Sequence, residues 1–299
     1  MATPRILVLG GTGMLGHKVV QTLAPSFETY AAVRRGRALS RLPGIDRVKI
    51  LEGVDVTQQD AVAAMLAAVK PAVIVNCIGV VKQLAAAKDP VPSLTINSLL
   101  PHRLAALARL GGARLIHIST DCVFSGRKGM YQETDVADAE DLYGRSKLLG
   151  EVGGEQCLTL RTSIIGRELE SANGLVEWFL SQRGGRVKGY STAIFSGLTT
   201  IALAQEIHRV IAEFPGLNGL YQVSVDAIDK ATLLGLLRSA FHAAVEVIPD
   251  GSLKIDRSLV STRYRQATGF TPPSWSRLVE EMAADARLVG YDRRAGGQP

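Results

Sequence analysis

The sequence predicts an α/β protein in which a doubly wound parallel sheet is followed by a smaller C-terminal α/β lobe. Across the first half of the chain, short apolar runs rich in β-branched residues alternate with longer segments rich in Ala and Leu. The apolar runs are continuous, which is typical of parallel strands covered on both faces. The chain has 299 residues, of which 46% are hydrophobic and 21% charged, the composition of a soluble globular protein.

The elements of the first half follow in order. The first strand is predicted at 5–10, an apolar run ending at a glycine, and the first helix at 14–24, where apolar residues are spaced by three and four. Similar apolar runs predict further strands at 28–33, 48–53, 72–79, 114–119 and 157–163. Ala- and Leu-rich segments predict helices at 58–69, at 92–110 and around 142–151. Pro101 lies inside one of these helices, and we expect it to break or kink that helix.

Beyond about residue 165 the alternation loosens. Helices are predicted at 174–183, 201–213, 229–242 and 274–289, with short strands at 220–225 and 245–249. We therefore divide the chain at this point into a first domain, 1–165, and a smaller lobe, 166–299, some segments of which return to the main sheet. The final ten residues are polar and glycine-rich, and we expect them to be mobile.

Composition argues against several classes of function. No apolar run approaches the roughly 20 residues that a membrane-spanning helix needs, and the N-terminus lacks the core of a signal peptide, so a cytoplasmic protein without a membrane partner is expected. The cysteines Cys77, Cys122 and Cys157 are too widely spaced to suggest zinc or disulfides, and no metal site is predicted. The net charge of +6 is spread along the chain, so an anionic small ligand explains it as well as nucleic acid, which we do not predict.

A glycine pattern directly follows the first predicted strand. Residues 10–16 read GGTGMLG and lead into the first predicted helix. Glycines allow a tight turn and a close approach to a pyrophosphate, while the helix N-terminus offers unpaired N–H groups and a positive dipole end. Plain turns also contain such glycines, but the position between strand and helix favours dinucleotide binding by a Rossmann-type domain. The predicted cofactor contacts of this segment are Gly10, Thr12, Gly13, Met14, Leu15 and Gly16.

The end of the second predicted strand indicates which dinucleotide is bound. A carboxylate at this position binds the ribose 2′-hydroxyl of NAD, whereas an arginine accommodates the 2′-phosphate of NADP. Residues 31–37 read AAVRRGR and contain no acid. Arg34 and Arg35 therefore favour NADP(H), with NAD(H) as the other option.

Two further segments complete the predicted cofactor site. Asp55 and Val56 follow the third strand, where an adenine ring would lie, and the Asp55 carboxylate could accept from the exocyclic amine. Cys77 and Gly79 follow the fourth strand and are small enough for the cofactor to pass close to the backbone. We assign no chemistry to Cys77.

Three polar residues are predicted to lie where the reaction would take place. Thr120 follows the fifth strand, at the sheet edge where ligands of such folds gather. Tyr143 and Lys147 are four residues apart on a predicted helix, so they share one face. An ammonium group beside a phenol favours the phenolate, so Lys147 is expected to lower the pKa of Tyr143. On its own, Y-x-x-x-K is more often part of a solvated surface helix than of a catalytic site.

In this order and on these elements, the glycine turn, the Thr after strand five and Y-x-x-x-K resemble the extended short-chain dehydrogenase/reductase superfamily. Five segments narrow the resemblance to the dTDP-4-dehydrorhamnose reductase branch. They are STDCVFSG (119–126), GMYQETD (129–135), LYGRSKLLGE (142–151), LRTSIIG (160–166) and FSGLTT (195–200). The late segments DRSLVST and TGFTPPSW are similar to the C-terminal pattern of that branch.

The resemblance implies a reaction and a role for each residue. The reaction is NADP(H)-dependent reduction of the 4-keto group of a nucleotide-activated 6-deoxysugar, in cell-surface polysaccharide synthesis. Tyr143 would be the general acid, Lys147 would hold the nicotinamide ribose, and Thr120 would hydrogen-bond the carbonyl. The expected substrate contacts are Asp121, Cys122, Asn173 and Trp178. Enzymes of this branch are often dimers, so a homodimer is also an expectation.

Two alternatives remain open at this point. Cys122 falls where related epimerase–reductases place a catalytic cysteine, but their partner histidine is missing here, and Lys188 is the only basic residue that could replace it. The other alternative is a non-catalytic, NADP-binding regulatory subunit, against which the intact Thr120, Tyr143 and Lys147 argue. Dehydration is not expected, because Asp121 is followed by Cys122 and not by the glutamate that dehydratases of the superfamily carry.

Overall fold

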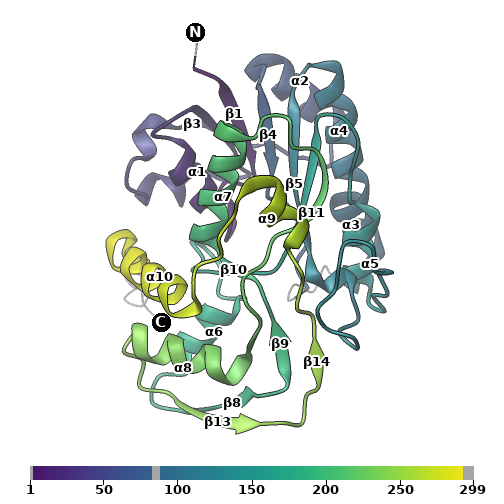
Figure 1. Cartoon of the computed structure of the whole chain (residues 1–299). Helices are drawn as coiled ribbons and strands as arrows, with labels where there is room; N and C mark the ends of the chain where they lie inside the picture. Colours follow the sequence, from purple (N-terminus) through teal and green to yellow (C-terminus); the bar gives the residue numbers. More distant parts are fainter. Residues whose placement is uncertain (1–2, 83–87, 292–299) are drawn as a thin grey trace.

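The computed structural model describes residues 3–82 and 88–291. A seven-stranded sheet, parallel throughout, forms the upper half of the molecule in Figure 1. In spatial order its strands are β11 (Gly219–Gln222), β6 (Cys157–Thr162), β5 (Arg114–Thr120), β4 (Val73–Asn76), β1 (Arg5–Leu9), β2 (Glu28–Ala32) and β3 (Lys49–Leu51). The strand order reverses between β1 and β4, which opens a crevice at the carboxyl ends of the strands. The predicted doubly wound α/β fold is confirmed.

Helices cover both faces of this sheet. The helices α1 (Gly16–Leu23) and α7 (Thr200–Glu213) pack on one face, and α2 (Gln59–Val69) and α4 (Leu100–Leu110) on the other. Neighbouring residues of one strand serve different faces, because side chains alternate along a strand. On β5, Leu115 belongs to the core under α2 and α4, whereas Ile116 belongs to the core under α1 and α7.

The helical segment around Pro101 does not break. The short α3 (Pro90–Ser93) continues into a π-helical stretch over Leu94–Leu99 and then into α4. Pro101 lies in the first turn of α4, where the missing N–H of proline costs least. The predicted break is therefore wrong, because the change of helix type before Pro101 accommodates the proline.

The lower lobe in Figure 1 is built from α6 (Leu175–Ser181), α8 (Lys230–Ala240) and short strands. The strands β8 (Arg186–Tyr190) and β13 (Glu246–Asp250) form a parallel pair, and β9 (Ala193–Phe195) lies between β12 (Ile228–Asp229) and β14 (Ile255–Asp256). The pair β7 (Ile164–Ile165) and β10 (Leu198–Thr199) connects this lobe to the main sheet. Short 3-10 turns occupy Leu39–Arg41, Ile45–Arg47 and Asp121–Val123. The polar helix α9 (Thr262–Thr268) was not predicted.

The last described residues return to the body of the protein. Helix α10 (Trp275–Val289) packs its apolar face into the main core and ends at Gly290, whose φ of 69° is left-handed. The chain then turns so that Tyr291 is buried. Mobility predicted for Gly290 and Tyr291 is therefore wrong, because Tyr291 packs against α1, while 292–299 lie outside the described residues.

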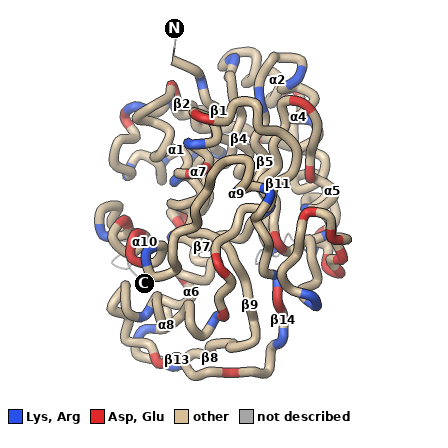
Figure 2. Tube along the Cα trace, in the orientation of Figure 1, with Lys and Arg blue, Asp and Glu red and all other residues tan. Residues whose placement is uncertain are grey.

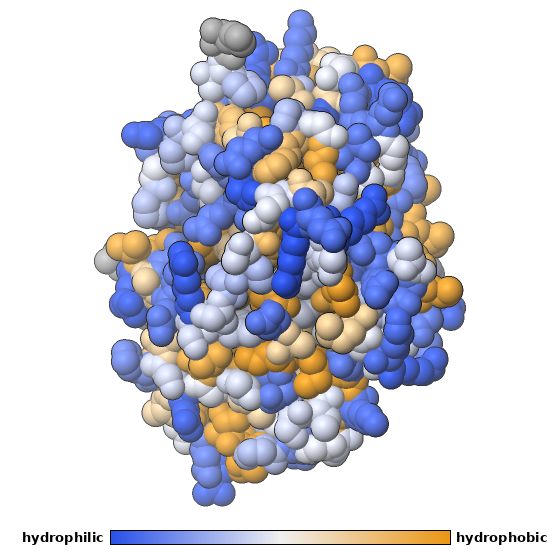
Figure 3. Space-filling view, viewed as in Figure 1, coloured by the Kyte–Doolittle hydropathy of each residue, from blue (hydrophilic) through white to orange (hydrophobic). Residues whose placement is uncertain are grey.

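Charged residues of both signs are interspersed over the two halves of the molecule (Figure 2). Hydrophilic residues cover most of the face shown in Figure 3, and apolar residues gather there in small areas. Of the helices in the described part of the chain, none is long and apolar enough to span a membrane.

Candidate active site

A cavity of about 700 Å³ lies where the carboxyl ends of the strands meet the lower lobe. Most of the residues predicted for the cofactor and the reaction line it. These are Thr12, Gly13, Met14, Leu15, Arg34, Cys77, Gly79, Thr120, Asp121, Cys122, Tyr143, Lys147 and Asn173. The crevice at the strand-order reversal thus contains the predicted phosphate-binding turn and the predicted reacting residues in one space.

The glycine turn closes on itself tightly. Gly10 has a φ of +80°, a left-handed conformation that favours glycine, and its carbonyl accepts from the Gly13 N–H at 2.9 Å. A Cβ on Gly16 would lie only 2.0 Å from the Gly10 carbonyl oxygen. Gly10 and Gly16 do not line the cavity. They shape the turn so that Gly13 is exposed within it.

Of the two arginines that follow β2, one lines the cavity and the other does not. Arg34 lines the cavity, whereas Arg35 is exposed outside its lining. Asp55 is also exposed, and its carboxylate accepts from the N–H and hydroxyl of Thr57. Val56 packs against the core under α2 and α4. Roles for Arg35, Asp55 and Val56 at the cofactor stay predictions.

Helix α5 (Leu142–Leu149) positions Tyr143 and Lys147. The Asp141 carboxylate caps its N-terminus by accepting from the Gly144 N–H at 2.7 Å. A Cβ on Gly144 would lie 2.2 Å from the Cys122 carbonyl oxygen, so glycine lets the helix approach the segment after β5 closely. The Thr120 hydroxyl donates to the Asp121 carboxylate at 3.2 Å, and it lies close enough to the phenol of Tyr143 to act on its pKa.

Lys147 is buried at the floor of the cavity. Its ammonium donates to the Ile118 carbonyl oxygen at 2.7 Å. Burial lowers the pKa of Lys147 to about 8, although the charge of Glu151 opposes this shift. Glu151 is held in turn by Arg161 at 2.7 Å and by the Ser119 hydroxyl at 2.7 Å.

The pKa of Tyr143 moves in the direction opposite to the one predicted. Burial raises it well above its ordinary value, and the nearby Cys122 and Asp121 add to the rise, while the Thr120 hydrogen bond opposes it. The expected net lowering of the Tyr143 pKa is therefore wrong here, because burial is the largest effect and the neighbouring charges add to it. Tyr143 is consequently a phenol that keeps its proton at neutral pH.

Asp121 and Cys122 face the same space. Burial raises the pKa of the Asp121 carboxyl, and Arg257 opposes the rise. Burial and the Asp121 charge together raise the pKa of the Cys122 thiol to about 12. Cys122 is therefore a neutral thiol at physiological pH, which does not suit it to act as a base.

The lower lobe contributes two cations that the sequence pattern did not reveal. Lys230 begins α8 and Arg257 follows β14, and both line the cavity. Arg257 donates to the Phe124 carbonyl oxygen at 2.8 Å. Within 3–82 and 88–291, neither residue forms an ion pair. Nothing in their local sequence signals a site, because only the tertiary fold brings them beside Asp121 and Cys122.

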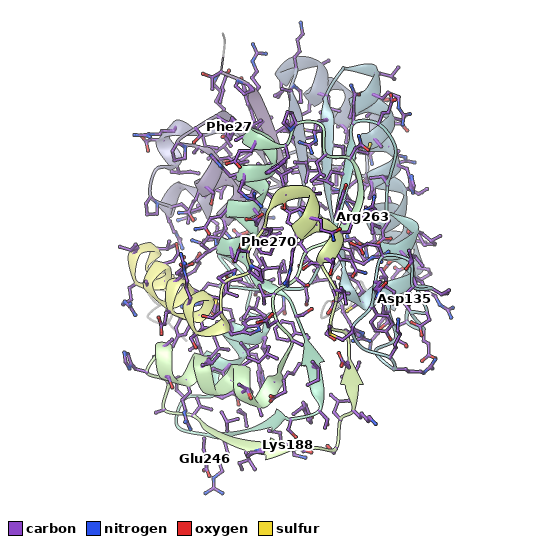
Figure 4. The ribbon with its side chains drawn as sticks, viewed as in Figure 1. Phe27, Asp135, Lys188, Glu246, Arg263 and Phe270 are labelled. Carbon is purple, nitrogen blue, oxygen red and sulfur yellow. The ribbon has the colours of Figure 1, made fainter. Side chains whose placement is uncertain are left out.

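Three other predicted residues have different surroundings. Asn173 lines the cavity, and its N–H donates to the Glu168 carboxylate at 2.8 Å. Trp178 is 39% exposed and lies outside the cavity lining, so its substrate contact stays a prediction. Lys188 pairs with Asp250 at 2.9 Å near the outer edge of the lower lobe, where Figure 4 labels it beside Glu246. It does not line the cavity and therefore cannot replace the missing histidine beside Cys122.

The fold and the cavity define a Rossmann-type α/β protein with a glycine turn between its first strand and first helix. The family described as "RmlD substrate binding domain" matches residues 4–184, so this chain belongs to that family. A probable dTDP-4,6-dihydroxy-2-methyloxan-3-one 4-ketoreductase of Streptomyces antibioticus is 31% identical over 248 residues, covering 71% of this chain and 79% of the relative. The resemblance noted in the sequence is thereby confirmed.

Two other relatives match about half of this chain. A dTDP-4-dehydrorhamnose reductase of Streptomyces griseus is 32% identical over 149 residues, covering 50% of this chain and 44% of the relative. The methionine adenosyltransferase 2 subunit beta of Danio rerio is 34% identical over 148 residues, covering 49% and 42%. This chain thus spans less than half the length of these two relatives in the matched region.

Solved structures show the same fold over nearly the whole chain. A dTDP-4-dehydrorhamnose reductase of Bacillus anthracis in complex with NADP has a TM-score of 0.77 at 22% identity, covering 95% of this chain and 100% of that one. The Bordetella bronchiseptica enzyme WbmG in complex with NAD has a TM-score of 0.79 at 17% identity, covering 97% and 96%. At these identities the similarity establishes the fold.

Proposed function

We propose that this protein is an NADP(H)-dependent reductase of the 4-keto group of a nucleotide-activated 6-deoxysugar. The observation that carries the proposal is the cavity in which Tyr143, Thr120 and Lys147 share one space with the glycine turn and Arg34. The names of the relatives that match the chain support the substrate class. In this proposal 1–165 binds the cofactor and 166–299 mainly binds the substrate.

The residues present fit a pyridine dinucleotide. A side chain at Gly16 would collide with the Gly10 carbonyl, so this tight turn requires glycine at that position. A turn of this kind lets a pyrophosphate approach the backbone closely. Arg34 lines the cavity and supplies the charge that a 2′-phosphate requires. We therefore propose NADP(H) as the preferred cofactor, with NAD(H) as the other option.

The chain's own residues would handle the proton. When bound, the reduced nicotinamide supplies a hydride to the carbonyl carbon of the sugar. Tyr143 donates its phenolic proton to the carbonyl oxygen, and the high pKa that burial imposes keeps the proton available until charge develops on that oxygen. Thr120 lines the same cavity and would hydrogen-bond the carbonyl oxygen of the substrate. Lys147, still largely protonated at neutral pH, would hold the nicotinamide ribose from the floor of the cavity.

The lower lobe would hold the substrate by its diphosphate. Lys230 and Arg257 place two cations in the cavity lining, and Asn173 adds a polar side chain. Asp121 is their acidic neighbour, and water screens charges less in a half-buried wall than at the surface, so this wall would attract an anion. The sugar would then lie between this wall and Tyr143.

The direct test mixes the protein with NADPH and a dTDP-4-keto-6-deoxysugar and follows the loss of NADPH absorbance. Tyr143→Phe should lower kcat by roughly 10² to 10⁴, since it removes the proton donor, and should leave the Kd for NADPH nearly unchanged. Tyr190→Phe, a tyrosine outside the cavity lining, is the matched control and should keep full activity. Wild-type activity retained by Tyr143→Phe would exclude the acid role.

The other candidates predict different outcomes. A regulatory subunit would bind NADPH tightly without turning over any sugar nucleotide, and the similarity to methionine adenosyltransferase 2 subunit beta is the observation in its favour. An epimerase would bring solvent deuterium into the ring of recovered substrate and would lose this activity in Cys122→Ser. The neutral Cys122 thiol and the distant Lys188 argue against the epimerase.

Two expectations about the protein in the cell belong to this proposal. A homodimer stays a prediction, which light scattering on the purified protein checks. A cytoplasmic location and a role in cell-surface polysaccharide synthesis likewise follow from the proposed reaction. Among the described residues no group of three or more His, Cys, Asp or Glu side chains could hold a metal ion.

A further inference from the structure

A buried histidine connects the C-terminal end of the described chain to the phosphate-binding turn. His17, in the first turn of α1, lies with one ring nitrogen, Nδ1, 2.8 Å from the Gly13 carbonyl oxygen. Its other ring nitrogen, Nε2, lies 2.5 Å from the Tyr291 hydroxyl. His17 and Tyr291 are 274 residues apart in the sequence and both are buried.

The chemistry of the three groups sets the direction of the hydrogen bonds. A carbonyl oxygen only accepts, so His17 Nδ1 carries a proton and donates it to Gly13. In a neutral imidazole the other nitrogen then accepts, and the Tyr291 hydroxyl donates to it. The Tyr291 hydroxyl therefore holds one ring nitrogen of His17 while the other binds the Gly13 carbonyl.

The Gly13 carbonyl is the link to the cavity. It accepts from the His17 side chain and also from the His17 backbone N–H at 3.1 Å. Because the peptide bond is planar and trans, a carbonyl held toward α1 turns the following N–H, that of Met14, the other way. Gly13 and Met14 both line the cavity, and the amides at a helix N-terminus are the groups that bind a pyrophosphate.

Tyr291 is itself held firmly. Gly290 adopts the left-handed conformation that ends α10 and turns the chain back toward α1. The Tyr291 ring lies between the Arg167 guanidinium, 4.9 Å from the ring centroid, and the Lys18 ammonium, 5.5 Å from it. Lys18 also pairs with Asp285 of α10 at 2.6 Å, which fixes α10 to α1.

We propose that Tyr291 and His17 are positioning residues for the dinucleotide, which hold the Gly13 peptide in the orientation that binds the pyrophosphate. The last described residue of the chain thus belongs functionally to the cofactor site, although it does not touch the cavity. This inference rests on the proposed function only in that a dinucleotide pyrophosphate binds at the glycine turn.

The test measures NADPH binding to the full chain by fluorescence titration, which needs no sugar substrate. Tyr291→Phe removes one oxygen atom and with it the hydrogen bond between Tyr291 and His17, so the Kd for NADPH should rise roughly threefold to tenfold. The matched control is Tyr264→Phe, which removes a different buried hydroxyl, bonded to Glu206 at 2.8 Å, and should leave the Kd unchanged. An equal Kd for wild type and Tyr291→Phe would overturn the proposal.

A second variant separates positioning from general loss of structure. His17→Gln should weaken NADPH binding at least as much as Tyr291→Phe, and adding Tyr291→Phe to it should cause little further loss, because both act through Gly13. Additive losses would show two independent structural effects and would refute the proposal. In turnover, the KM for NADPH should rise with kcat retained at saturating NADPH, whereas a fall in kcat alone would contradict a role in cofactor binding.

The outcomes also distinguish this inference from the proposed function. If wild type binds no NADPH, both fail together. If wild type binds NADPH and reduces no sugar nucleotide, the enzyme assignment fails, but the comparison of Tyr291→Phe with Tyr264→Phe still decides the role of Tyr291.

Discussion

At the scale of single residues, the candidate site combines groups that burial disfavours. Lys147 is a buried cation, and Tyr143 is a phenol whose ionisation burial opposes. A protein gains no stability from such an arrangement, because desolvation of a charge costs more than one carbonyl contact returns. Residues that lower stability and line a cavity are the ones expected to carry function.

Lys147→Met tests this cost. Burial lowers the pKa of Lys147 in the folded protein to about 8 from an unfolded value of 10.5, so the unfolded chain binds the extra proton more tightly. The loss of stability caused by burying the Lys147 ammonium is therefore complete below pH 8. The free energy of unfolding of wild type increases as the pH rises from about 8 to 10.5. We expect Lys147→Met to be about 1 to 3 kcal/mol more stable than wild type at pH 7.

Urea unfolding at a series of pH values measures this difference. The advantage of Lys147→Met should shrink as pH rises through the window from 8 to 10.5, while reductase activity is lost at every pH. A difference that stays constant with pH would show that Lys147 is not desolvated.

At the scale of elements, helix α5 illustrates how a small residue creates a site. Gly144 lies between Tyr143 and Lys147 in the chain and faces the backbone of Cys122. Gly150, at the end of the same helix, faces the backbone of Asn97, where a Cβ would lie 1.8 Å from the carbonyl oxygen. Both glycines let the helix pack directly on neighbouring backbone, and this close packing brings Tyr143 to Thr120.

Gly144→Ala should therefore move Tyr143 away from Thr120. The added Cβ would lie 2.2 Å from the Cys122 carbonyl oxygen, so α5 or the segment after β5 must move. We expect kcat to fall at least about tenfold, since a displacement on the order of 1 Å is enough to misalign a proton donor. NADPH binding at the glycine turn should change much less.

The control for this variant is Gly235→Ala in α8, where a Cβ would meet no atom within 4 Å. It should keep its activity and gain roughly 0.5 to 1 kcal/mol, because alanine favours a helix more than glycine does. Steady-state kinetics and thermal unfolding of both variants test this prediction. Full activity of Gly144→Ala would show that the close contact between Gly144 and the Cys122 backbone is not required for catalysis.

At the scale of the whole molecule, the two halves of the sequence are not two separate folding units. Strand β11 adds to the edge of the main sheet beside β6, and α7 covers the face of the sheet next to α1. Arg114 of β5 reinforces this return by donating to the carbonyl oxygens of Val210 and Leu217. The cavity consequently needs the entire chain.

A fragment of 1–165 should not fold on its own. Without α7 it would expose the apolar side chains of Ile116, Leu158 and Leu160, which share one core with α7 residues. We expect this fragment to show no cooperative thermal transition and no NADPH binding, in contrast to the full chain. A fragment that unfolds cooperatively and binds NADPH would establish 1–165 as an independent domain.

The sequence alone was sufficient for the central sheet, the glycine turn and the residues of the cavity that lie at strand ends and helix starts. These features are local: strands and helices follow from apolar periodicity, and the carboxyl ends of parallel strands meet at one edge. Thr120, Tyr143 and Gly13 were predictable for this reason, since each lies next to a strand end or a helix start.

Only the tertiary structure decided the rest, because it depends on groups that are distant along the chain. Lys230 and Arg257 face the cavity, and Tyr291 reaches His17, only through the packing of the lower lobe and α10. The sequence likewise could not predict the direction of the Tyr143 pKa shift. Burial is the largest cause of that shift and depends on all the residues packed around Tyr143, whereas the Y-x-x-x-K spacing identifies only Lys147 as a neighbour.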